Sequence, residues 1–171
     1  MREDKVYPVE ELHYRMSSVL DYTALKELMM ERFGNRSDFQ VLENLNDRYL
    51  LCVTPTGEVV AMTGIYDGNN YNAPEIDWTC VSKKYECLGL MTKMVGMLLE
   101  KHTGPVYCSC WRWFEKEHVN LKKIMDTYGF KEVMRDHKKY RSDINYFCSE
   151  CVHKCEGCHC SEDLYYREGT L

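Results

Sequence analysis

The 171-residue sequence has no long apolar run, no surplus of positive charge, no internal repeat and no low-complexity linker. No run of apolar residues approaches the ~20 needed to span a bilayer, so we expect a protein that does not cross a membrane. The residues after Met1 are charged and lead into no hydrophobic signal segment, from which we expect a cytoplasmic location. With 27 acidic and 22 basic residues, the net charge is −5. This balance disfavours nucleic-acid binding, which depends on neutralising phosphates, and suits an amine-bearing partner better.

Length and composition predict a chain that can bury a core of its own. A chain of 171 residues lies in the common size range of single domains, and its hydrophobic content of 44% lies in the globular range. We expect residues 1–147 to form the main domain. Residues 148–171 are expected to form a cysteine-rich, metal-binding C-terminal extension that packs on it.

The segment from Glu75 to Lys101 predicts a strand, a tight loop and a helix. Between residues 75 and 80 polar and apolar side chains alternate, the period of a strand with two different faces. From Leu88 on, apolar residues recur at the helical spacing of three and four. We expect Gly104 to cap the end of this helix in the left-handed conformation. The N-terminus of such a helix presents unpaired N–H groups and favours an anion, and Gly89 there lets a ligand approach the backbone.

The hexad from Glu86 to Met91 resembles motif A of the GNAT superfamily of acyl-CoA-dependent N-acyltransferases. In that motif a strand ending in Val is followed by Arg/Gln-x-x-Gly-x-Gly/Ala at the start of a long helix. Gly89 matches the middle glycine. Glu86 stands in place of the basic or amide residue, and Met91 in place of the last small one. An acid beside a pyrophosphate is repulsive, and a large side chain at the last position crowds the cofactor.

The flanking segments follow the order of elements in the same family, over about residues 6–147. They are an opening strand, a first helix, a hairpin with a Pro-Thr-Gly turn, and a late helix followed by Gly129-Phe130: residues 9–16, 21–28, 49–65 and 121–128. The resemblance implies an α/β fold of the α+β type, with a mixed, mostly antiparallel twisted sheet flanked by helices.

The resemblance also implies acetyl-CoA as cosubstrate. In this family the central strand diverges from its neighbour, and the pantetheine arm of the cofactor lies in the gap. The backbone groups expected to bind the arm belong to Thr79, Cys80 and Val81. The N–H groups expected to hold the pyrophosphate belong to Cys87, Leu88, Gly89, Leu90 and Met91. His118 falls where the family often has an Asn that touches the cofactor arm.

Three residues are candidates for the chemistry of acetyl transfer. Many members of the family place a Glu at the position of Glu75, where it takes the proton of the amine. Asp77 lies two residues on, and two carboxylates on one face raise the pKa of one of them, which suits a base near neutral pH. The family's usual Tyr acid falls on Met125, which cannot donate a proton. Tyr128 lies on the same helical face and could substitute, or water could supply the proton.

The segment from Trp111 to Phe114 ends the next strand and could line an acceptor pocket. Aromatic faces suit the apolar stem of a lysine or polyamine and can bind a cation directly. Core packing is the competing interpretation for these rings. Arg112 would repel a cationic acceptor unless its side chain points away.

Half of the ten cysteines fall between residues 148 and 160: Cys148, Cys151, Cys155, Cys158 and Cys160. Two C-x2-C pairs have the spacing of metal knuckles, and four thiolates complete a tetrahedral zinc site. Only three residues separate the pairs, so Cys160, His153 or His159 could replace one ligand. Four protein ligands leave no open position, which predicts a structural Zn2+; the alternatives are an iron–sulfur cluster and free or disulfide-linked cysteines. Cys108 and Cys110 share one face of a strand, where core packing is expected.

Two function classes remain open at this point. The first is an acetyl-CoA-dependent N-acetyltransferase acting on a primary amine of a small molecule or a protein, by direct transfer in a ternary complex. The second is a catalytically silent module of the same fold, with a structural zinc segment and a binding or regulatory role. The departures at Glu86, Met91 and Met125 favour the second, and Glu75 favours the first. The sequence does not decide the oligomeric state.

Overall fold

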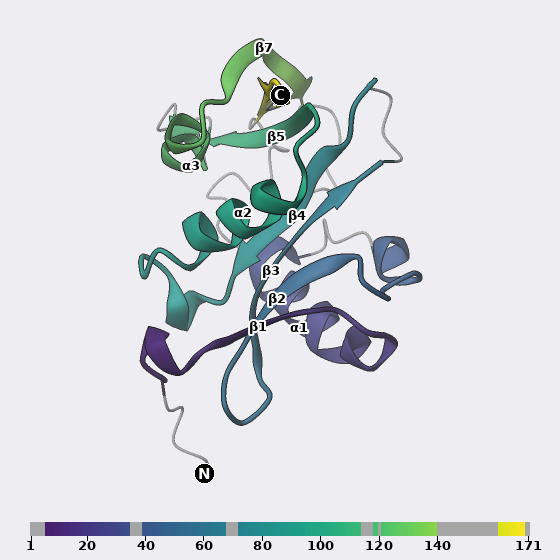
Figure 1. Ribbon diagram of the computed structural model, residues 1–171, viewed down its shortest axis with the longest axis vertical. Helices are drawn as coiled ribbons and strands as arrows, with labels where there is room; N and C mark the ends of the chain where they lie inside the picture. The colour runs from purple at the N-terminus through teal and green to yellow at the C-terminus, as the bar shows by residue number, and fades with distance from the viewer. Residues whose placement is uncertain are drawn as a thin grey trace, which may run out of the picture.

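A computed structural model describes residues 6–34, 39–67, 72–113, 118–119, 121–139 and 161–169. Within them a single sheet has the strand order β1-β2-β3-β4-β5-β8-β7, and the short β6 pairs with β5 (Figure 1). All neighbouring strands are antiparallel except β4 and β5, which are parallel. The expected mixed, mostly antiparallel sheet flanked by helices is confirmed.

The predicted strand, hairpin and helix elements are present, with small shifts at their ends. The strands are β1 (His13–Met16), β2 (Tyr49–Val53), β3 (Val59–Tyr66), β4 (Glu75–Val81), β5 (Val106–Trp113), β6 (His118–Val119), β7 (Lys131–Lys139) and β8 (Ser161–Arg167). The α-helices are α1 (Tyr22–Phe33), α2 (Leu90–Lys101) and α3 (Lys122–Thr127). Short 3-10 turns occupy Val9–Glu11, Val19–Asp21, Phe39–Leu42 and Lys83–Tyr85. Among the described residues no helix combines the length and the apolar character that crossing a membrane requires.

Helices α1 and α2 cover opposite faces of the sheet and divide the core into two clusters (Figure 1). On one face Leu25 and Met29 of α1 are fully buried. On the other, Met94 and Val95 of α2 are fully buried, as their helical spacing predicts. Burial of such a side chain stabilises the fold by about 1.5–3 kcal/mol relative to its exposure. Strand β4 is therefore held in place by buried side chains on both faces of the sheet.

Helix α2 ends differently from the prediction. Its C-cap is His102, which has an extended backbone with φ −107°, and the His102 N–H donates to the Leu98 carbonyl oxygen. The expectation that Gly104 provides a left-handed cap is therefore wrong. The chain leaves the helix directly into an extended conformation and needs no residue with positive φ there.

Strand β4 contains a bulge that the alternation of polar and apolar residues in the sequence does not predict. Met62 pairs with Cys80 and Gly64 with Asp77, so that Thr63 alone lies opposite two residues of β4. The extra residue is Trp78, whose φ is +46°. As a result Ile76 packs in the cluster under α2, whereas Cys80 packs in the cluster under α1. The expectation of one strict alternation through residues 75–80 is wrong, because the bulge exchanges the two faces halfway.

Strand β8 lies inside the sheet, between β5 and β7. Its residues Leu164 and Tyr165 are buried. This segment was expected to belong to a C-terminal extension, but it pairs along its whole length with β5, from Arg112↔Ser161 to Val106↔Arg167. The cysteine-rich residues 148–160 therefore lie along the chain between β7 and β8, and they are outside the described residues, as is the expected boundary after residue 147.

Candidate active site

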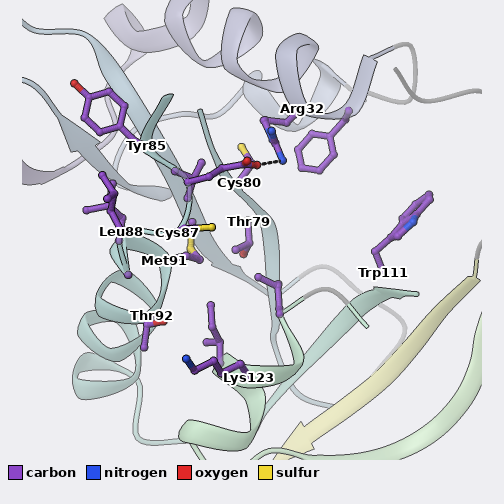
Figure 2. A pocket seen from close by; sticks show the side chains of 17 residues that line it. Arg32, Thr79, Cys80, Tyr85, Cys87, Leu88, Met91, Thr92, Trp111 and Lys123 are labelled. Atoms are coloured by element: carbon purple, nitrogen blue, oxygen red, sulfur yellow. Dashed lines mark ion pairs between the residues drawn. The ribbon is translucent and has the colours of Figure 1, made fainter. Parts of the chain in front are cut away.

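A pocket opens where β4 and β5 separate. The two strands pair only at Glu75↔Tyr107 and Ile76↔Cys108. Beyond this point they diverge, and a cavity of about 650 Å³ lies between them and the start of α2 (Figure 2). Its wall consists of Arg32, Phe33, Thr79, Cys80, Val81, Tyr85, Glu86, Cys87, Leu88, Gly89, Leu90, Met91, Thr92, Trp111, Leu121, Lys123 and Ile124. Peptide groups of diverging strands can bind an extended ligand that carries amides of its own.

All eight cofactor-binding candidates of the strand and the loop line this pocket: Thr79, Cys80, Val81, Cys87, Leu88, Gly89, Leu90 and Met91. Cys80 is buried, and burial raises the pKa of its thiol to about 12. A thiol with that pKa is uncharged near neutral pH, so Cys80 belongs to the wall rather than to the reacting groups. The Thr79 hydroxyl forms a hydrogen bond of 2.8 Å with the Thr63 hydroxyl, which fixes the strand beside the bulge.

The loop before α2 is held in place by side chains and has an unusual backbone. The Tyr85 hydroxyl accepts the Tyr7 N–H at 3.0 Å, and Glu31 Oε1 of α1 accepts the Lys83 N–H at 2.8 Å. Cys87 and Gly89 both have positive φ, +61° and +75°. A Cβ added at Gly89 would meet no atom within 4 Å. The backbone at the start of α2 is therefore open to a ligand, and its conformation favours glycine.

Glu86, the acid that replaces the motif's basic residue, is paired with an arginine. Arg32 Nη2 of α1 lies 2.6 Å from Glu86 Oε1, and both side chains line the pocket (Figure 2). Arg32 was not predicted as a site residue, because its position on α1 is far from the motif along the chain and no local pattern marks it. The pair neutralises the negative charge that the sequence places beside the proposed pyrophosphate site.

The two carboxylates of β4 lie near the start of the gap and outside the wall of this pocket. Glu75 Oε1 accepts the Ser109 N–H at 3.2 Å, at the first residues of β5 that have left β4. Asp77 Oδ1 accepts the Trp78 N–H at 2.8 Å and so supports the bulge. Burial, and after it the charge of Asp77, raise the pKa of Tyr49, whose ring lies in the cluster under α1. Asp77 thus faces the α1 side of the sheet.

The Tyr128 hydroxyl is engaged with α2 and lies outside the pocket wall. It donates to the Thr92 carbonyl oxygen at 2.7 Å. Met125, at the family's usual Tyr position, is fully buried. Gly96 of α2 permits the contact, since a Cβ at this position would collide with the Tyr128 hydroxyl oxygen. In this arrangement Tyr128 joins α3 to α2.

We predict that Gly96→Ala lowers the free energy of unfolding by about 1–3 kcal/mol, because the added methyl forces the Tyr128 ring to move. Chemical denaturation checks the value. The matched control is the same substitution in a Tyr128→Phe background, where the colliding oxygen is absent and the cost should be clearly smaller. Equal costs in the two backgrounds would show that the contact between Gly96 and Tyr128 does not exist.

Trp111 and Arg112 of β5 point to opposite sides. Trp111 lines the pocket, and its expected place in the wall of an acceptor site stays a prediction. Arg112 binds Asp136 and Asp163, with its Nε 3.0 Å from Asp163 Oδ2, and therefore points away from the pocket. The side chains of Trp113, Phe114 and His118 lie outside the part of the chain whose side chains are described.

No group of three or more His, Cys, Asp or Glu side chains that could hold a metal occurs among the described residues. The five predicted zinc ligands, Cys148, Cys151, Cys155, Cys158 and Cys160, lie outside them. Cys108 and Cys110 are both buried in the core, with their sulfur atoms 3.8 Å apart, in agreement with the expected packing role.

Solved structures with this fold include an N-acetyltransferase and proteins bound to CoA or to a bisubstrate analogue. The ribosomal-protein-S18-alanine N-acetyltransferase from Escherichia coli superposes with a TM-score of 0.66 at 11% identity, over 94% of this chain and 95% of that one. NAA60 from Arabidopsis thaliana, in complex with a bisubstrate analogue, gives 0.65 at 13% identity, over 93% and 99%. A chain of the NatC complex bound to Gag peptide and CoA gives 0.66 at 14% identity, over 94% and 99%.

At these identities the structural likeness shows the fold alone, and no curated protein sequence matches significantly. The family described as the acetyltransferase (GNAT) family matches residues 19–122, which is more than half of the sequence. The chain therefore belongs to the acetyltransferase (GNAT) family.

Proposed function

We propose that this protein is an acetyl-CoA-dependent N-acetyltransferase that transfers the acetyl group directly to a primary amine of a small molecule or a protein. The observation that carries the proposal is the pocket between β4 and β5, which extends from the diverging strands to the start of α2. The E. coli alanine N-acetyltransferase with the same fold supports an amine acceptor, and the NatC structure supports CoA.

The residues of the pocket fit a ligand with an extended amide-bearing arm and a diphosphate. The backbone at Thr79–Val81 would pair with the arm, and the N–H groups at the start of α2 would hold the diphosphate. The space above Gly89 is open for the phosphates, and in this structure the ion pair with Arg32 offsets the negative charge of Glu86. Acetyl-CoA supplies the activated acetyl group; the protein supplies position and acid–base chemistry.

Glu75 is the proposed base. Its carboxylate is half-buried at the point where β4 and β5 part, and the Ser109 N–H donates to Oε1, which holds the group at the parting of the strands, where it could take the proton of the amine directly or through water. Asp77 is the secondary candidate, because its Oδ1 accepts the N–H of the next residue in its own strand, whereas Glu75 reaches across to β5 where the two strands part. Tyr128 would have to leave Thr92 to serve as the acid, so water at the open pocket is the simpler source of the leaving thiolate's proton.

Incubation with acetyl-CoA and a panel of amines tests the proposal. The panel should contain a polyamine, an amino acid, a peptide with a free N-terminus and a peptide with an internal lysine, with acetylated products identified by mass spectrometry. Saturation with acetyl-CoA should also stabilise the fold, by about 2.7 kcal/mol at 100 times its Kd. Absence of any stabilisation at millimolar acetyl-CoA would contradict the proposal.

The second candidate function is a catalytically silent module. The buried Met125 at the usual acid position, together with the engagement of Tyr128 by Thr92, favours it. Such a protein would be stabilised by acetyl-CoA as strongly as an enzyme, yet it would acetylate no amine of the panel. The two readouts together therefore separate the two functions.

We also propose a structural zinc ion bound by four ligands of the segment 148–160, on the spacing of its cysteines alone. Purified protein should contain about one zinc per chain, because four thiolates complete one tetrahedral site. Elemental analysis measures the zinc content. Reduced thiols that bind a metal also fit the cytoplasmic location that we propose. Cys148→Ser and Cys151→Ser together should remove the metal, whereas Cys87→Ser, at an exposed free thiol elsewhere, should not. A metal content near zero with free thiols in this segment would contradict the site.

A further inference from the structure

The charges in the wall of the pocket are unusual for a diphosphate site. Within the part of the chain that the structure describes, three charged residues line it: Arg32, Glu86 and Lys123. Glu86 directly precedes Cys87, at the start of the loop that lines the pocket. A carboxylate at this place opposes a diphosphate, and each of the two positive charges in the wall comes from another element, Arg32 from α1 and Lys123 from α3.

The ion pair between Arg32 and Glu86 is asymmetric. The Arg32 side chain is 19% exposed, whereas that of Glu86 is 47% exposed. Arg32 is therefore the more fixed partner, and Glu86 can turn into solvent at little cost in hydration. The neighbouring Glu31 accepts the Lys83 N–H at 2.8 Å and the Ser82 hydroxyl at 3.4 Å. These bonds attach the last turn of α1 to the loop between β4 and α2 and keep Arg32 beside the pocket.

We propose that Arg32 is a binding residue for the diphosphate of CoA, and that Glu86 is the counter-ion it holds until the diphosphate arrives. This inference rests on the proposed function and adds a residue to the same site. A guanidinium group binds phosphate oxygens in a bidentate manner, and partial burial of the group strengthens these hydrogen bonds. On binding, Arg32 exchanges one carboxylate charge for a more negative group, while Glu86 turns to water.

The exchange has a consequence for affinity. Glu86 competes with the ligand for Arg32, so the carboxylate weakens the binding of CoA even though it holds the arginine in place. Removal of the negative charge at residue 86 should therefore tighten binding, and removal of the positive charge at residue 32 should weaken it. Pantetheine lacks the diphosphate, so neither change should alter its affinity.

Calorimetric titration of four proteins with CoA and with pantetheine tests the exchange. The proteins are the wild type, Arg32→Met, Glu86→Gln and the double variant. We expect Arg32→Met to weaken CoA binding by about 10-fold or more, since charge-assisted bonds to phosphate are strong. Glu86→Gln should tighten it several-fold, and the double variant, which also lacks the opposing carboxylate, should bind more weakly than the wild type but no more weakly than Arg32→Met. Arg32→Lys, which keeps the charge and loses the bidentate geometry, should fall between the wild type and Arg32→Met.

Wild-type affinity for CoA in the double variant would overturn the proposal, because Arg32 would then only neutralise Glu86. Unchanged affinity in Arg32→Met would overturn it as well, and so would an equal loss of affinity for pantetheine. If the wild type bound neither ligand, the proposed function would fail together with this inference. If the wild type bound CoA and the substitutions of Arg32 left that affinity unchanged, this inference alone would be refuted. Unfolding curves of each variant confirm that the affinities belong to folded protein.

Discussion

Glu75→Gln is expected to lower the rate of acetyl transfer by about 100-fold or more while the affinity for acetyl-CoA stays the same. General-base catalysis contributes about 10²–10⁴-fold, and glutamine keeps the shape of glutamate without its basicity. The side-chain oxygen of the introduced glutamine can still accept the Ser109 N–H, so the divergence of β4 and β5 should persist. Steady-state kinetics with a titration of acetyl-CoA measures both quantities. The loss should shrink at high pH, where more of the amine is already deprotonated.

Asp77→Asn is the matched control for this substitution. It makes the same chemical change two residues away, and the side-chain oxygen that remains can still accept the Trp78 N–H that supports the bulge. If Glu75→Gln were fully active at pH 7 and Asp77→Asn were not, the role of base would pass to Asp77. If both variants were fully active, a carboxylate base would be excluded, and the positioning of the amine against the thioester would have to account for the rate.

Gly89→Glu is expected to abolish CoA binding. Gly89 has φ +75°, and the space above it is open to the pocket, so the new side chain would place bulk and negative charge where the phosphates approach the backbone. Gly89→Gln separates the two effects, because it adds similar bulk without charge and should retain more affinity. Isothermal titration measures the affinities of both variants.

Gly57→Glu is the control for the strain that positive φ imposes on any other residue. Gly57 has φ +89° and, like Gly89, would present a Cβ to open space, but it lies in the turn between β2 and β3. This variant should lose a comparable amount of stability and none of its affinity for CoA. Unchanged affinity in Gly89→Glu would refute the assignment of residues 86–91 to the diphosphate.

The local elements of the site could be predicted from the sequence because their signals are local. Apolar spacing marks α2, alternation marks the start of β4, and Gly89 marks the open backbone between them. The bulge at Trp78 could not be predicted in this way, because the alternation of polar and apolar residues in the sequence is the same with or without a bulge in the strand. The pair between Arg32 and Glu86 could not be predicted either, because it is formed only when α1 docks on the loop.

Strand β8 could not be predicted from the sequence for a different reason. Its sequence begins Ser161-Glu-Asp163, and a charged residue in the middle of a sheet is not expected from hydropathy. Asp163 is nevertheless buried, because Arg112 Nε lies 3.0 Å from its Oδ2 and the Asp136 N–H donates to its Oδ1 at 2.9 Å. Buried charge of this kind requires a partner, and the partner lies on another strand. Neither the burial nor the pairing can be seen from the segment itself.

Hydrogen exchange of the wild-type protein, measured by mass spectrometry with and without saturating CoA, tests the central claim most directly. The claim is that CoA binds between β4 and β5 and against the start of α2. We predict that CoA slows amide exchange in residues 79–92, with Cys87 to Met91 among the most protected, and leaves the turn at 54–57 unchanged. Unaltered exchange in residues 79–92, or protection confined to another surface, would contradict the account.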